Sequence, residues 1–269
     1  MSRPPVGLTI AGSDPSGGAS IAADLKTFSA LGVYGTSVVT ALTAQSTQGV
    51  TGVHVAPTEF VTQQLETLIA DVRLDTIKIG MLANAAIVGG AGYFLRHHPH
   101  DHVVLDPVMV ATSGDRLLDD DAIQAVSDLL PLASLVTPNL AEAAALLDTR
   151  PARTLPDLRL QATALQQLGA PRVLIKGGHR NDGPEAVDLL LDVDGETLLR
   201  APRVDTVNTH GTGCTLSSAL AALRPQRDSW LEAGLDAKRW LTAALAAADV
   251  LEIGQGHGPV HLFHEIWGH

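Results

Sequence analysis

The stretch Thr206-Val-Asn-Thr-His-Gly-Thr-Gly-Cys-Thr-Leu-Ser-Ser-Ala-Leu-Ala-Ala-Leu223 decides the interpretation of this chain, because a Gly-Thr-Gly-Cys turn opens directly onto a run of small helix formers. Gly211 and Gly213 let the backbone approach a charged group closely. The free N–H groups of the first helical turn then point at that group, together with the positive end of the helix dipole. The stretch therefore predicts an anion-binding site.

Cys214 lies within this predicted anion-binding site, at the positive end of the helix dipole. A thiol at a helix N-terminus is expected to have a lowered pKa, which would let Cys214 serve as a general base. The alternative is a packing role, since free cysteines are often simply buried. The neighbouring glycines favour the functional interpretation. Because Cys214 is the single cysteine, the chain forms no internal disulfide, which fits a reducing compartment.

Composition favours one α/β domain over residues 1–269, since 45% hydrophobic content with only 3% aromatic content supplies a core of Ala, Leu and Val. The formal net charge of −11 argues against nucleic acid or an anionic membrane as the main partner. The N-terminus has no signal-like apolar segment, and no run reaches the length of a membrane-spanning helix. We expect a cytoplasmic protein.

Short apolar runs alternate with longer Ala/Leu-rich helical patterns, which is typical of a mostly parallel sheet with helices on both faces. The expected strands are Val6–Ile10, Ser37–Leu42, Thr76–Ile79, Val103–Leu105, Leu135–Thr137, Arg172–Lys176 and Val187–Leu191. Such sheets bind ligands beyond the carboxyl ends of their strands. That edge would collect Gly12-Ser13-Asp14, Gly80-Met81, Asp106-Pro107, Thr137-Pro138-Asn139 and Gly177-Gly178.

Three further segments are interpreted as connections. Asp148–Asp157 and Gly254–Gly258 have the composition of loops. The pair Asp194-Gly195 after an apolar run predicts a β-hairpin, which would be either a lid over the cleft or an ordinary edge hairpin.

Two histidine clusters are not assigned to a metal. Arg96-His-His-Pro-His-Asp-His102 lacks the spacing of a closed coordination shell, and His261-Leu-Phe-His264-Glu265 is expected to be a surface segment. Neither a Walker-type loop nor a dinucleotide fingerprint occurs in the required context.

Two motifs at strand ends carry charged side chains. Asn139 can cap a helix with Glu142 one turn on, and Glu142 would be either a helix-stabilising residue or a Mg²⁺ ligand beside a polyphosphate. Lys176 ends an apolar strand, where an unpaired ammonium would be costly to bury. We therefore expect Lys176 to reach a phosphate or a carboxylate.

Seven motifs together carry a family resemblance. They are Ala11-Gly-Ser-Asp-Pro-Ser-Gly-Gly18, Ala41-Leu-Thr-Ala-Gln45, Lys78-Ile-Gly-Met81, Asp106-Pro-Val-Met109, Thr137-Pro-Asn-x-x-Glu142, Ile175-Lys-Gly-Gly-His179 and Asn208-Thr-His-Gly-Thr-Gly-Cys214. From about Val6 to Leu251, the chain resembles the hydroxymethylpyrimidine/phosphomethylpyrimidine kinases of thiamine biosynthesis, which belong to the ribokinase-like superfamily. It departs from them at Thr112, where many carry Lys, and at Ser20-Ile-Ala22, where many carry Gly-Ile-Gln.

The resemblance implies a three-layer α/β/α fold and phosphoryl transfer from ATP, with Mg²⁺, to a hydroxymethylpyrimidine and then to its monophosphate. It implies that Gly211, Thr212, Gly213 and Cys214 form the catalytic anion hole. Gln45 is the candidate for binding the pyrimidine edge, because its amide places a donor beside an acceptor. The other implied contacts are Asp24, Gly12, Met81 and Val110 for the pyrimidine, Lys176, Asn139 and Thr209 for ATP, and Glu142 for the metal.

Three further expectations accompany this assignment. The protein is expected to be a homodimer. A second enzyme interpretation is a pyridoxal or pyridoxine kinase, because relatives with a similar Gly-Thr-Gly-Cys loop accept such alcohols. A third is a catalytically silent pyrimidine sensor, which Lys176, Glu142 and the glycine loop disfavour because a binding module needs no phosphate-neutralising set.

Overall fold

The computed structural model describes residues 3–109, 120–178 and 183–267. The strands are β1 (Val6–Ala11), β2 (Tyr34–Val39), β3 (Ala41–Ser46), β4 (Gly49–Val55), β5 (Thr76–Ile79), β6 (Val103–Leu105), β7 (Leu135–Val136), β8 (Val173–Ile175), β9 (Glu185–Asp192) and β10 (Gly195–Pro202). The α-helices are α1 (Ser20–Ala30), α2 (Thr58–Ile69), α3 (Ala85–His97), α4 (Asp120–Ser127), α5 (Leu140–Leu146), α6 (Leu155–Gln167), α7 (Thr212–Leu223) and α8 (Trp230–Ala246).

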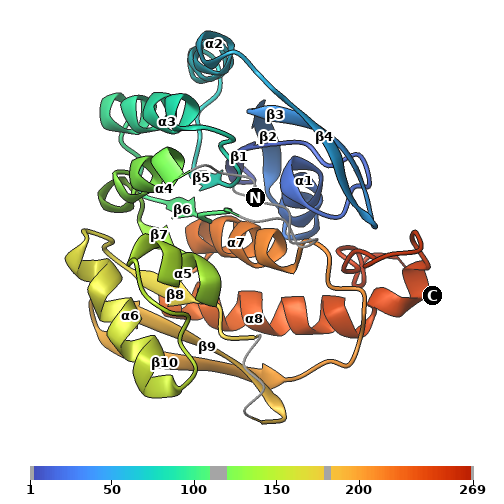
Figure 1. The fold of residues 1–269 in the computed structure, drawn as a ribbon. Coiled ribbons are helices and arrows are strands. Elements are labelled where there is room, and N and C mark those ends of the chain that lie inside the picture. The colour runs from blue at the N-terminus through green and yellow to red at the C-terminus, as the bar shows by residue number, and fades with distance from the viewer. Residues whose placement is uncertain (1–2, 110–119, 179–182, 268–269) are drawn as a thin grey trace.

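A central sheet of eight strands organises the molecule (Figure 1), in the order β10-β9-β8-β7-β6-β5-β1-β2. The pairings from β2 to β8 are parallel, and β9 and β10 extend the sheet as antiparallel strands. The four residues of β5 and the three of β6 and of β8 are all buried, as expected for central parallel strands covered on both faces. The predicted, mostly parallel sheet is confirmed.

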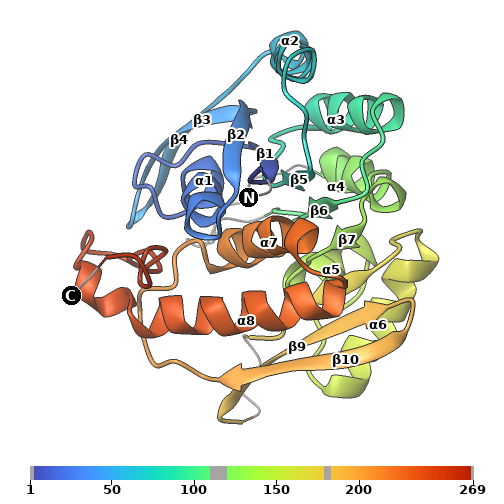
Figure 2. The ribbon, with the colours of Figure 1, turned by 180° about the vertical axis from the view of Figure 1, so that it is seen from behind.

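Helices cover both faces of this sheet. Helices α2 to α6 pack in sequence over one face, and α1, α7 and α8 pack over the other (Figures 1 and 2). Helix α7 is buried over all nine residues from Thr215 to Leu223, which fits a helix that is apolar on every side. Its small side chains let it lie between α1 and α8. The three-layer α/β/α architecture is therefore confirmed.

The expected strand Ser37–Leu42 is wrong, because it spans the end of β2 and the start of β3. Thr40 separates the two strands: its N–H donates to the Ala11 carbonyl at 2.9 Å and its hydroxyl to the Met81 carbonyl at 2.7 Å. After Thr40 the chain leaves the main sheet and forms a separate β3–β4 hairpin.

The hairpin predicted near residue 194 is present as β9 and β10. Its strands pair Asp192 with Gly195, so the turn centres on Val193 and Asp194, one residue earlier than expected. This hairpin forms an edge of the main sheet, which is the second of the two interpretations.

Two expectations for other segments need correction. The segment around His261 is not a surface segment, since His261 is buried together with Leu262. The predicted loop before Asp157 ends earlier, because Thr154 caps a helix that begins at Leu155. Gly254–Gly258 does form an irregular loop. Among the helices of the described ranges, none is both long and apolar enough to cross a bilayer.

Candidate active site

A lysine and two carboxylates meet where the central strands end. Lys176 directly follows β8, and its Nζ lies 2.6 Å from Oδ1 of Asp106 and 3.7 Å from Oε2 of Glu142. Asp106 directly follows β6, and Glu142 lies in the first turn of α5. The carboxyl ends of parallel strands share one edge, so three distant segments of the chain meet here. The expectation that Lys176 reaches a carboxylate is confirmed.

The charges in this cluster perturb one another. Burial would lower the pKa of Lys176, but the charge of Asp106 and then that of Glu142 outweigh burial and raise it above its ordinary range. Burial raises the pKa of Glu142 to about 7, and the charge of Asp106 adds to this rise against the opposing effect of Lys176. The Lys176 ammonium is thus shared by two buried carboxylates, Asp106 and Glu142. Ionising Glu142 as well as Asp106 therefore costs free energy.

Asn139 and Glu142 form the predicted cap of α5. The Asn139 side chain accepts hydrogen bonds from the backbone N–H groups of Ala141 and Glu142, each at 2.9 Å, and the Glu142 carboxylate accepts from the Asn139 N–H at 2.7 Å. This capping box fixes the Glu142 carboxylate beside Lys176. The amide oxygen of Asn139 is used by the cap.

The glycine loop opens α7 as predicted. Gly211 is the N-cap of the helix and has a left-handed φ of 74°, which favours glycine. A side chain there would collide with the Gly18 carbonyl, whose carbon lies 2.8 Å from the position of a Cβ atom. At Gly213, a Cβ atom would lie 3.3 Å from Nζ of Lys176. The ammonium group and the helix N-terminus therefore face the same space.

Two side-chain interactions support this arrangement. Thr212 donates its hydroxyl to the Thr209 carbonyl at 2.7 Å, which closes the loop ahead of the helix. The hydroxyl group of Ser217, which lies one helical turn after Gly213 on α7, donates to Oδ2 of Asp106 at 3.2 Å. The residues Gly211, Thr212, Gly213, Thr209 and Lys176 are thus brought together.

Cys214 lies in this region but does not have the expected acidity. Burial raises the pKa of its thiol to about 11, and the charges of Asp24 and Asp106 add to the rise. The Lys78 charge and a hydrogen bond from the Ser20 backbone N–H act in the opposite direction without overcoming burial. The prediction of a lowered pKa is therefore wrong, because desolvation outweighs the charge of Lys78 and the hydrogen bond from Ser20. The thiol is protonated at neutral pH.

A buried Asp14–His210 pair joins the N-terminal loop to the glycine loop. Nε2 of His210 lies 2.8 Å from Oδ2 of Asp14, which also accepts the backbone N–H groups of Gly18 and Ala19. Burial would raise the pKa of Asp14, but hydrogen bonds from His210 and Ser16 outweigh burial and lower it. The pair holds Gly18 against Gly211.

The structure brings together only some of the residues that are expected to contact the pyrimidine. A Cβ atom on Gly12 would collide with the Met81 side chain, so these two residues are neighbours. Gln45 is half-buried on β3 and follows a register shift between β3 and β4. Bulges of this kind redirect side chains and are frequent next to active sites. Val110 lies outside the described residues.

Asp24 occupies a different environment from the one expected. It is fully buried, lies 2.9 Å from Nζ of Lys78 and accepts the hydroxyl groups of Thr9 and Ser218. Each carboxylate oxygen therefore has protein donors, which suits a core ion pair that joins α1, β1, β5 and α7. We do not retain Asp24 among the substrate ligands.

Asp106, Asp14, His210 and Ser217 are the site residues that sequence reasoning missed. Asp106 and Asp14 were noted only as members of strand-end turns and of family motifs, and His210 only as a member of a family motif, with no role assigned to any of them. A carboxylate directly after a buried central strand is itself a signal, because that position faces the ligand edge of the sheet. The role of Ser217 depends on helix rotation and has no comparable sequence signal.

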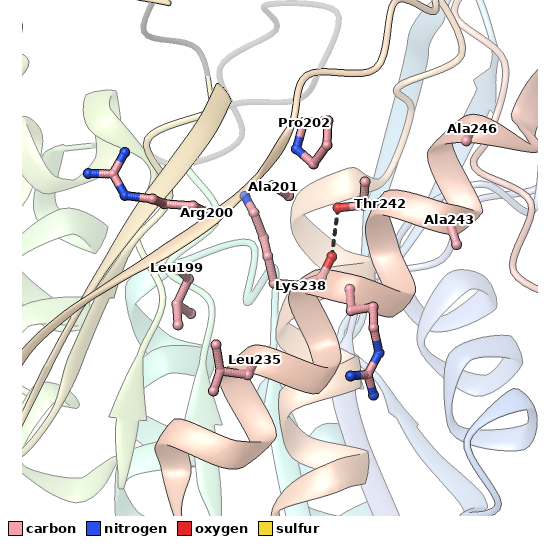
Figure 3. Close-up of a pocket in the computed structure, with 10 residues that line it drawn as sticks. Leu199, Arg200, Ala201, Pro202, Leu235, Lys238, Thr242, Ala243 and Ala246 are labelled. Carbon is pink, nitrogen blue, oxygen red and sulfur yellow. Dashed lines mark hydrogen bonds between the residues drawn. The ribbon is translucent and has the colours of Figure 1, made fainter. Parts of the chain in front are cut away.

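A separate pocket lies between β10 and α8 (Figure 3). It has a volume of about 360 Å³, and its lining includes Leu199, Lys238 and Thr242. None of the predicted site residues lines it. A chain of hydrogen bonds nevertheless connects the pocket with Gly177, which directly follows Lys176: Nζ of Lys238 lies 2.7 Å from Oδ2 of Asp188, and Oδ1 of Asp188 accepts the Gly177 N–H at 2.9 Å.

The fold and the site place this protein in the ribokinase-like class of α/β kinases. The structure is similar to an ADP complex of Bacillus subtilis pyridoxal kinase, with a TM-score of 0.90, 34% identity and coverage of 98% of this chain and 100% of that one. It is also similar to phosphomethylpyrimidine kinase from Clostridium difficile, with a TM-score of 0.79, 38% identity and coverage of 90% and 99%.

The family follows from sequence comparison. Residues 14–261 match the model of the phosphomethylpyrimidine kinase family. A hydroxymethylpyrimidine/phosphomethylpyrimidine kinase from Salmonella typhimurium is 57% identical over 261 residues, which cover 97% of this chain and 98% of that protein. The chain belongs to the phosphomethylpyrimidine kinase family.

Proposed function

We propose that the protein transfers the γ-phosphoryl group of ATP to the hydroxymethyl oxygen of 4-amino-5-hydroxymethyl-2-methylpyrimidine, and then a second phosphoryl group to the resulting monophosphate. The observation that carries this proposal is the Lys176 ammonium facing the glycine-rich N-terminus of α7 at the ligand edge of the sheet. Full-length similarity to kinases named for these two substrates supports the assignment.

The chemistry needs charge neutralisation more than covalent assistance. Phosphoryl transfer proceeds through a loose transition state whose charge lies on the phosphoryl oxygens. Lys176 and the first N–H groups of α7 would bind these oxygens in fixed positions, without reorganisation during the reaction. The Cys214 thiol, protonated at neutral pH, would orient the attacking hydroxyl rather than remove its proton as a thiolate.

The carboxylates fit Mg²⁺. Mg²⁺ is usually held by one or two carboxylates plus substrate phosphates and water. In the described ranges, no group of three His, Cys, Asp or Glu side chains could hold a metal by itself. Glu142 would hold Mg²⁺ directly or through water, with Asp106 adjacent. When bound, the ion would neutralise phosphate charge.

We assign the base of ATP to the pocket between β10 and α8. Its lining is mostly apolar, as suits a purine ring, and its Lys238 is connected through Asp188 to Gly177, next to Lys176. Thr242→Trp, which fills the pocket, should raise the KM for ATP at least tenfold and leave the KM for the pyrimidine nearly unchanged. Equal effects on both substrates would refute this placement.

A substrate panel tests the function. Purified protein with Mg²⁺-ATP should phosphorylate hydroxymethylpyrimidine and its monophosphate with higher kcat/KM than pyridoxal. A higher kcat/KM for pyridoxal would favour the second enzyme interpretation, which similarity to pyridoxal kinase keeps relevant. Tight pyrimidine binding without ATP turnover would indicate a sensor.

The remaining assignments are also proposals. We propose that residues 1–269 act as one domain, that the protein forms a homodimer in the cytoplasm, and that it binds neither nucleic acid nor membranes. Exposed apolar side chains on the β3–β4 hairpin, Leu42 and Val53, support self-association. The net charge of −11 supports the absence of polyanionic partners. Sedimentation analysis would decide the oligomeric state.

A further inference from the structure

The loop Gly254–Pro259, called here the C-terminal strap, contacts the turn of the β3–β4 hairpin. The Gly256 N–H donates to the Thr47 hydroxyl at 3.2 Å, and the His257 N–H donates to the Thr47 carbonyl at 3.1 Å. Thr47 lies two residues after Gln45. The strap therefore contacts the hairpin two residues from Gln45, the candidate substrate-binding residue.

The strap contacts the hairpin at backbone distance. A Cβ atom on Gly256 would collide with the Thr47 carbonyl group, with its carbon only 2.6 Å away and the Gln48 nitrogen 3.0 Å away. On Gly254, which has a φ of 74°, a Cβ atom would lie within 2.9 Å of Cβ of Thr47. These glycines permit a contact that other residues would prevent.

The other half of the strap contacts the loop that leads into α7. The Gly258 N–H donates to the Asn208 side chain at 3.1 Å, and the His210 N–H donates to the Gly258 carbonyl at 3.0 Å. Nδ1 of His257 lies 3.0 Å from the Val207 carbonyl oxygen. His210 directly precedes Gly211, so the strap is hydrogen-bonded to the residue next to the glycine loop.

The strap is fixed at its C-terminal end. Pro259 forms a parallel bridge with His210, and the following Val260 and Leu262 are buried in the core formed around α7 and α8. The strap is therefore anchored in the core on its C-terminal side and hydrogen-bonded to the hairpin turn through Gly256 and His257.

We propose that the C-terminal strap is a positioning element that fixes the Gln45-bearing hairpin relative to the glycine loop, so that the pyrimidine hydroxyl and the phosphoryl group are aligned. This inference rests on the proposed function of Gln45 and the glycine loop. It explains why three glycines alternate within five residues here, two of them in close contact with Thr47. A displacement of about 1 Å is enough to cost about a hundredfold in rate.

The test uses Gly256→Ala in the full chain, with Gly89→Ala as the control. Gly89 lies on an exposed part of α3 and has open space around it. Gly256→Ala should raise the KM for hydroxymethylpyrimidine at least tenfold and lower kcat, with the KM for ATP within about twofold of wild type. Amide hydrogen exchange should accelerate together in residues 43–50 and 207–211, and Gly89→Ala should show neither change.

Pyrimidine KM and exchange rates that match those of Gly89→Ala would overturn the inference. If Gly256→Ala does not fold, Thr47→Val decides, because it removes only the hydroxyl acceptor of the Gly256 N–H. That variant should accelerate exchange in both segments about fivefold, and no acceleration would overturn the inference. Wild-type protein inactive on the pyrimidine would instead refute the proposed function, while the exchange measurement would still test the strap.

Discussion

Replacing Gly211 by alanine gives the sharpest test of the glycine loop. Gly211 has a left-handed φ of 74°, and a Cβ atom there would overlap the Gly18 carbonyl group and approach Cα of Ala19 to 3.1 Å. All of these obstacles are backbone atoms, so no side-chain rotation can relieve the overlap. The two loops must separate by about 1 Å or more.

The expected magnitude has two components. A left-handed backbone costs a non-glycine residue about 1–2 kcal/mol, and separating the loops strains the Asp14–His210 pair that joins them. We therefore expect a stability loss of about 2–3 kcal/mol. Loss of one positioned donor in an anion hole lowers kcat by about 10²–10³, which is the effect we expect on both phosphorylation steps.

Steady-state kinetics and urea denaturation would measure the two components separately. Gly213→Ala is the informative comparison, because its Cβ atom would approach only Nζ of Lys176, at 3.3 Å, and no backbone atom. It should lose less activity than Gly211→Ala. Gly89→Ala should keep the kinetics of wild type and be more stable by about 0.5–1 kcal/mol, because alanine is the better helix former at this exposed position of α3. A folded Gly211→Ala protein with kcat within threefold of wild type would refute the assignment of this loop to phosphate binding.

Three other variants test individual side chains. Gln45→Ala should weaken pyrimidine use by about 1–3 kcal/mol in kcat/KM through the loss of two hydrogen bonds, with ATP affinity retained, and equal losses for both substrates would make Gln45 structural. Cys214→Ala should lower kcat by about 10² through loss of the group that orients the attacking hydroxyl, and alkylation of wild-type Cys214 should accelerate about tenfold per pH unit from pH 7 to 10, because its pKa is about 11. A labelling rate that levels off near pH 8.5 would contradict this burial effect. Glu142 has a folded-state pKa of about 7, raised from 4.5, so its contribution to stability is complete below pH 4.5 and is lost as the pH rises towards 7. Glu142→Gln should remove this dependence, worth up to about 3 kcal/mol between pH 4.5 and 8 in urea denaturation, and parallel pH profiles for variant and wild type would exclude it.

The fold could largely be predicted because its central strands are continuous apolar runs between turns. Thr76–Ile79 and Val103–Leu105 match the structure at both ends. The β3–β4 hairpin could not be predicted as a separate unit, since β4 contains two glycines and mostly exposed residues. What separates β3 from β2 is the pair of tertiary hydrogen bonds made by Thr40, and these have no local signal.

In the candidate site, too, features with a local sequence signal could be predicted, and features that depend on tertiary contacts could not. Lys176, Glu142 and the glycine loop could be predicted because their chemistry follows from local sequence and strand ends. The acidity of Cys214 could not, because it depends on burial and on Asp24 and Asp106, which tertiary folding brings near. The burial of Asp24 could not be predicted either, because its ion-pair partner, Lys78, lies 54 residues further along the chain.

The position of α7 in the middle of one helical layer has a consequence for biosynthesis. This helix packs against α1, α8, β5 and β6, yet it is made about a hundred residues after β6. At about 5–20 residues per second, a nascent chain would leave the apolar face of β5 and β6 uncovered for about 5–20 s before α7 is made. Folding on the ribosome would therefore be completed late, and during this interval the emerging chain would be a substrate for chaperones that bind exposed apolar strands.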